Sequence, residues 1–85
     1  MSDTARTDIS ADLAAAIELL ERREATAHMA YREIRDRLDE DARNAVPAMS
    51  AEERATERRD LHRASARWTE AQEALAALRE LARTR

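Results

Sequence analysis

Apolar positions repeat with helical spacing along the first half of the chain. They alternate at intervals of four and three residues, at Leu13, Ile17, Leu20, Ala27, Tyr31, Ile34 and Leu38. One position in this series, residue 24, is a glutamate. A heptad pattern kept this long is typical of a helix that packs along one seam against another helix. The pattern predicts a first helix over about residues 9–43, starting near the good N-cap residues Asp8 or Ser10.

A second series of the same kind follows in the other half of the chain, at Leu61, Ala64, Trp68, Ala71, Leu75, Leu78 and Ala82. Between the two series lies Pro47, which cannot continue a helix, and Asn44, which can adopt a left-handed C-cap conformation. Ser50 and Glu53 form the S-x-x-E pattern of a capping box. The sequence therefore predicts a turn over residues 44–49 and a second helix over about residues 50–83.

The short connection requires the two helices to run antiparallel and in contact. If the chain folds back at Pro47, two residues face each other across the helices when their residue numbers add up to a value in the low nineties. The expected pairs are Leu13 with Leu78, Ile17 with Leu75, Glu24 with Trp68, and Tyr31 with Leu61. We expect an all-α protein, an antiparallel hairpin of two long, coiled-coil-like helices. It forms one domain over residues 8–85 after a disordered leader, residues 1–7. The expected core is Leu13, Ile17, Leu20, Tyr31, Ile34, Leu61, Trp68, Leu75 and Leu78.

The chain is too small and too poor in large side chains to be stabilised easily by its own core. It has 85 residues, no Cys for a disulfide, and an apolar content that is mostly alanine. A single core of this size supplies only about 3–5 kcal/mol. Leu19 and Leu81 lie outside the seams near the open end of the hairpin, with Ala15 and Ala77. We therefore expect an interface there, through which two copies form a dimeric four-helix bundle.

The turn end of the hairpin, called the tip below, has a weaker apolar pattern. Ile34 and Leu38 face arginines across the seam, so we expect this end to be thinly packed. The sequence predicts that Val46, Met49, Arg54 and Arg58 contact a larger protein partner. The alternative is that the tip is frayed, as short connections often are.

Two features suggest chemistry at the middle of the first helix. Glu24 and His28 lie one turn apart, so a metal or small-ligand bundle using these residues, with His62 as a further weak candidate, is an alternative function. A carboxylate in a seam must also find a partner. Arg67 and the indole N–H of Trp68 are the candidates. The sequence alone predicts that Glu24→Leu stabilises the fold by about 1 kcal/mol, because it removes a buried charge. No cofactor is expected.

Arginines at 54, 58, 59, 63 and 67 give the second helix a basic stripe, which suggests nucleic-acid binding as a second alternative. The net charge is −3, and Glu57, Asp60 and Glu70 lie within one helical turn of these arginines. Pairing within the hairpin is therefore favoured over contact with phosphates.

No nucleophile beside a base and no Gly-rich phosphate loop is present, so the sequence does not predict an enzyme. The first residues lack the features of a signal peptide, and no apolar run is long enough to cross a membrane, so we expect a soluble, cytoplasmic protein without membrane contact. All fifteen basic residues are Arg, which indicates a GC-rich, bacterial or phage genome. The expected function is that of a small, non-catalytic protein–protein interaction module: an adaptor, subunit, chaperone or inhibitor.

Overall fold

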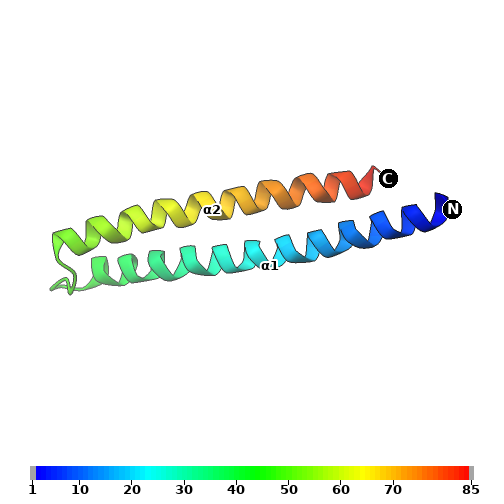
Figure 1. Cartoon of the computed structure of the whole chain (residues 1–85). Coiled ribbons are helices and arrows are strands. Elements are labelled where there is room, and N and C mark those ends of the chain that lie inside the picture. Colours follow the sequence, from blue (N-terminus) through cyan, green and yellow to red (C-terminus); the bar gives the residue numbers. More distant parts are fainter. Residues whose placement is uncertain (1, 85) are drawn as a thin grey trace.

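The computed structural model describes residues 2–84, and the side chains of residues 10–84. Two helices, α1 (Ser2–Arg43) and α2 (Ala51–Arg83), run antiparallel side by side, with both termini at one end (Figure 1). The described part of the chain contains no strand. The predicted all-α hairpin is therefore confirmed. Its radius of gyration is 19.2 Å, against about 12 Å for a compact domain of this length.

The first helix begins earlier than the sequence predicts. α1 starts at Ser2, so residues 2–7 belong to a helix rather than to a disordered leader. Met1 and Arg85 lie outside the described residues. Residues 2–9 contain neither Gly nor Pro, and Ser or Asp inside a helix costs only a few tenths of a kcal/mol. A good N-cap residue therefore does not start a helix when the residues before it can also be helical.

The start of α2 is fixed by the predicted capping box. The Ser50 hydroxyl accepts a hydrogen bond from the Glu53 N–H at 3.1 Å, and the Glu53 carboxylate accepts one from the Ser50 N–H at 3.5 Å. The end of α1 differs from the expectation. No residue in the described chain has a positive φ, so Asn44 is not a left-handed cap. Its N–H bonds to the Asp41 carbonyl at 3.3 Å instead, which tightens the last turn.

The seam between the helices forms a thin core. Among the described side chains, Leu75 and Ala64 are the only buried apolar ones. The other predicted core residues are half-buried: Leu13, Ile17, Leu20, Tyr31, Ile34, Leu61, Trp68 and Leu78. Two helices cover each other along one line only, so a seam side chain is shielded by its partner helix but open on both flanks. Within the described residues, neither helix contains a stretch long and apolar enough to span a membrane.

Asp41 organises the tip, contrary to the expectation of a thinly packed end. It is the most buried residue described, with 4% of its surface exposed. One carboxylate oxygen accepts the Met49 N–H at 2.9 Å, and the other lies 3.2 Å from Arg54 Nε. That Nε is buried and not aligned for a hydrogen bond, so the contact is an ion pair. Arg54 also donates to the Met49 carbonyl at 3.0 Å, which joins the last turn of α1, the loop and the first turn of α2.

Removing the Asp41 carboxylate is expected to destabilise the hairpin. Asp41→Ala leaves the Met49 N–H and the Arg54 guanidinium without their partner, and should lower the free energy of unfolding by about 1–3 kcal/mol in urea denaturation. Asp39→Ala removes an exposed carboxylate two residues away and is the matched control. Equal stability of the two variants would contradict the role assigned to Asp41.

Candidate functional site

The middle of the hairpin is held by a polar and aromatic layer around Trp68. Its indole N–H donates to Glu24 Oε1 at 2.7 Å, which confirms the predicted pairing of these two residues. The His28 ring stacks on the indole with centroids 4.2 Å apart and planes 9° apart. Tyr31 packs against the same indole, with the two ring centroids 5.4 Å apart. Glu24 and Arg67 form no ion pair, so the seam carboxylate is satisfied by the indole rather than by an arginine of its own chain.

The metal-ligand candidates do not converge within one chain. Glu24 and His28 both contact Trp68, and His62 is exposed on α2. Among the described residues, no three His, Cys, Asp or Glu side chains gather in the way that a metal ion requires. A site for a metal would therefore need ligands from a second molecule.

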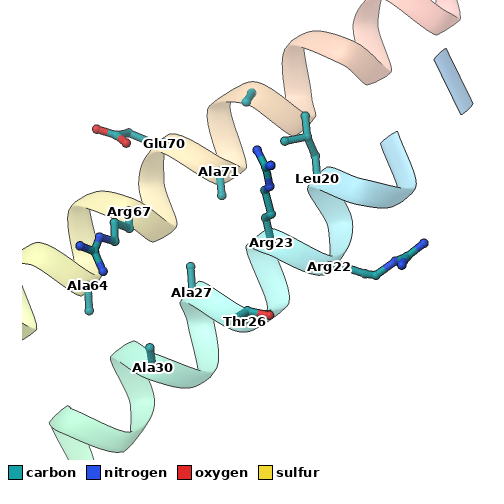
Figure 2. A pocket seen from close by; sticks show the side chains of 11 residues that line it. Leu20, Arg22, Arg23, Thr26, Ala27, Ala30, Ala64, Arg67, Glu70 and Ala71 are labelled. Carbon is teal, nitrogen blue, oxygen red and sulfur yellow. The ribbon is translucent and has the colours of Figure 1, made fainter. Parts of the chain in front are cut away.

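One flank of the seam is an open groove of about 570 Å³. Its walls are mainly alanine, and its rims carry charged side chains. The lining residues are Leu20, Arg22, Arg23, Thr26, Ala27 and Ala30 of α1, and Ala64, Arg67, Glu70, Ala71 and Ala74 of α2. In Figure 2, Ala27 and Ala71 point into the space between the helices, whereas Arg22 and Glu70 point away from it. The alanines on both helices leave this flank hollow, although the Arg23 side chain extends from α1 toward α2 (Figure 2).

The groove continues into the apolar residues predicted to form an interface. Leu19 lies one turn before Arg23 on α1, and Leu81 lies two turns after Ala74 on α2, so helical spacing places both leucines on the groove side. They are 48% and 43% exposed, and the alanines at 15 and 77 are exposed as well. We call this continuous surface the open-end face: the groove with Leu19, Leu81, Ala15, Ala16 and Ala77.

The opposite flank of the seam is polar. It contains a smaller hollow lined in part by Glu21, Gln72 and Arg79, and the Arg79 guanidinium lies 4.0 Å from the Glu21 carboxylate. The hairpin therefore has one flank with mainly polar and charged side chains and one, the open-end face, with mainly alanine and leucine.

The arginine stripe of α2 is mostly unpaired within the hairpin, unlike the sequence-based expectation. Arg54 pairs with Asp41, and Arg59 donates to the Thr56 hydroxyl at 3.2 Å. Glu57 pairs with Arg37 of α1 at 3.2 Å and so is not available to its neighbours on α2. In the described part of the chain, the arginines at 58, 63 and 67 form no ion pair and are exposed.

The four residues predicted to form a partner contact at the tip separate into two groups. The Arg54 guanidinium and the backbone of Met49 are engaged in the Asp41 cluster, whereas the Met49 side chain is half-exposed. Val46 is 84% exposed within the loop, and Arg58 is exposed on α2. Val46 and Arg58 are therefore the two of the four that are most open to a partner at this end.

Sequence reasoning missed two features. Asp41 occupies the next position of the α1 heptad after Leu38, so the spacing that located the seam also indicated that this carboxylate faces α2. Met29 is 63% exposed on α1, and nothing in the heptad pattern distinguished it from other non-seam residues.

No family model, no curated protein and no solved structure matches this chain.

The contact between Glu24 and Trp68 reverses the expected effect of a substitution. Glu24→Leu removes the acceptor of a half-buried indole N–H, so we expect it to lower the free energy of unfolding by about 1 kcal/mol rather than raise it. Glu24→Gln keeps an acceptor oxygen and should cost less. Urea denaturation followed by the fluorescence of the single tryptophan measures both. Glu73→Leu, on the exposed surface of α2, is the matched control. Stabilisation by Glu24→Leu alone would show that desolvation of the carboxylate outweighs its hydrogen bond.

Proposed function

We propose that this chain is a small, non-catalytic protein–protein interaction module that acts as a homo-oligomer, most simply a dimer that forms a four-helix bundle. The observation that carries the proposal is the open-end face, where Leu19 and Leu81 are exposed beside an alanine-walled groove. The proposed role in the cell is that of an adaptor, subunit, chaperone or inhibitor. The cytoplasm is the proposed compartment, and a bacterial or phage genome the proposed source.

The exposed area of the single chain supports this proposal. The hairpin has 6722 Å² of accessible surface, whereas a compact monomer of 9.7 kDa exposes about 5,100 Å². The difference, about 1,600 Å², is larger than the ~800 Å² that each partner buries in an interface of standard size. The chain therefore exposes more surface than a compact monomer does, and this excess is large enough to form one standard interface with a second copy on one flank.

Two other functions rank below this one. A metal or small-ligand bundle would use Glu24 and His28 together with residues of a second copy, and metal analysis of the purified protein tests it. Binding of nucleic acid through the exposed arginines at 58, 63 and 67 would show as retention of DNA or RNA that falls steeply with salt.

Leu81→Glu is expected to weaken self-association. In a symmetric dimer the substitution buries one carboxylate of each chain at a position where the native leucine would be buried. The dissociation constant should therefore rise at least about tenfold. Sedimentation equilibrium at micromolar protein measures the change. Met29→Glu changes an apolar residue outside the open-end face that is more exposed, at 63% against 43% for Leu81, and should leave the dissociation constant unchanged. A native chain that is monomeric at this concentration would overturn the proposal.

A larger protein partner is proposed at the tip, on the observation that Val46 is the most exposed large apolar residue described. Val46→Asp combined with Arg58→Glu should abolish recovery of such a partner from the source cell while the helical circular dichroism is unchanged. Val46→Asp with Arg63→Glu, which keeps Arg58, should recover the partner in part. Full recovery with the first pair of substitutions would exclude the tip as the contact.

A further inference from the structure

We infer that the second copy docks on the open-end face with its hairpin pointing in the same direction, so that α1 of each chain lies against α2 of the other. This inference rests on the proposed self-association and specifies its geometry. We call this the same-direction dimer. In the alternative, the opposed dimer, the hairpins point in opposite directions and α1 lies against α1.

The first argument is the distribution of apolar residues along the groove side of the hairpin. The groove lies midway along the hairpin, from Leu20 to Ala30 on α1 and from Ala64 to Ala74 on α2, and Leu19 and Leu81 extend its apolar lining toward the termini. Toward the tip, helical spacing places charged residues on the same side, at Glu33, Arg37, Asp60 and Arg63. A same-direction dimer lays the two grooves on each other and gathers the leucines at positions 19 and 81 of both chains at one end of the bundle. An opposed dimer centred on the groove also lays the two grooves on each other, but it separates the leucines of the two chains and sets those at position 81 beside the charged tip halves.

The second argument is the register of the hairpin itself. The residue numbers sum to 92 for Glu24 with Trp68 and to 94 for Arg37 with Glu57, so residues that sum to about 93 lie at the same height. In a two-fold dimer with parallel hairpins, a residue of α1 therefore faces the residue of the partner's α2 that completes this sum. Leu19 then faces the alanine at position 74 of the second copy, and Ala16 faces the alanine at position 77. Leu19 therefore has a small residue opposite it, as a packed bundle requires, and Leu81 lies opposite Asp12 of the second copy.

The third argument is the charge on the groove rims. Arg22 has a partner in its own chain, since its guanidinium lies 3.9 Å from Glu18. Arg23 and Glu70 have residue numbers that sum to 93, yet they form no ion pair across the groove in one chain. The same-direction dimer sets each Arg23 against the Glu70 of the other copy and so forms two symmetric pairs. The opposed dimer sets α1 against α1, where the arginines at 22 and 23 come near their own copies.

The native chain contains no Cys, so single cysteines report the arrangement directly. Ala16→Cys and Ala77→Cys are made in separate chains, exchanged by mixing, and oxidised under mild conditions. The same-direction dimer predicts a disulfide-linked dimer from the mixture and little from either variant alone, because residue 16 of one copy faces residue 77 of the other. Ala14→Cys mixed with Ala76→Cys, on the polar flank, is the matched control and should not link.

A charge exchange gives a second measurement. Arg23→Glu alone and Glu70→Arg alone should each raise the dissociation constant about tenfold, because two attractive pairs become repulsive. The double variant should return to within about threefold of the native value. Rescue by the double variant together with the mixed disulfide supports the same-direction dimer.

The possible failures are distinguishable. A native chain that sediments as a monomer overturns both the proposed function and this inference. A native dimer whose Ala16→Cys variant links to itself, or whose mixture does not link, overturns the same-direction arrangement and leaves self-association intact. A dimer that links through Ala14→Cys and Ala76→Cys shows that the polar flank is the interface, and overturns the open-end face as well.

Discussion

The hydrogen bond from Trp68 to Glu24 holds the register on which the rest of the hairpin depends. A heptad seam repeats every seven residues, and α2 offers similar alanines at 64 and 71, so apolar contacts alone distinguish poorly between registers one heptad apart. Glu24 is the acceptor for the indole N–H in this register, and a slip of seven residues would set the indole against Ile17 or Tyr31 instead of this carboxylate. The Asp41 cluster adds a second fixed point at the tip. Polar contacts thus stabilise one register of the two helices over others in which the small apolar residues would pack about equally well.

The high alanine content of the seam explains why the hairpin relies on these polar contacts, and it also motivates the proposed second layer. Alanines along the seam let the helices approach but bury little area, and in the described side chains only Leu75 and Ala64 are buried apolar residues. The apolar contribution to folding is correspondingly small. In the proposed dimer, the stability of a hairpin with so thin a core would depend in part on the second copy, so folding and association would be linked and would vary with protein concentration.

The fold could be predicted from the sequence because helical period, the capping box and Pro47 each leave a local signature. The pair of Glu24 and Trp68 could also be predicted, since it needed only the turn position and the antiparallel direction. The Asp41 cluster was missed for a physical reason: Asp41 ends an acidic run that resembles a solvated helix end, and its partners are a backbone N–H and an arginine beyond the loop. The groove was missed because alanine is common both on exposed helices and in close helix contacts, and sequence spacing does not distinguish the two.

The Asp41 cluster also changes how the exposed Val46 is understood. An apolar residue at a frayed turn would need no explanation, because it would sample many positions and bind nothing well. Here the loop is anchored on one side by the carboxylate that ends α1 and on the other by the capping box and the Arg54 contact that begin α2. A loop of seven residues held at both ends loses little conformational freedom when a partner binds it. Val46 is therefore already ordered by folding, so its ordering adds little to the entropy cost of binding. In a same-direction dimer, two such loops would lie at the same end of the bundle. That arrangement lets one partner with two sites engage both tips at once, and the second contact would then form at a high effective concentration.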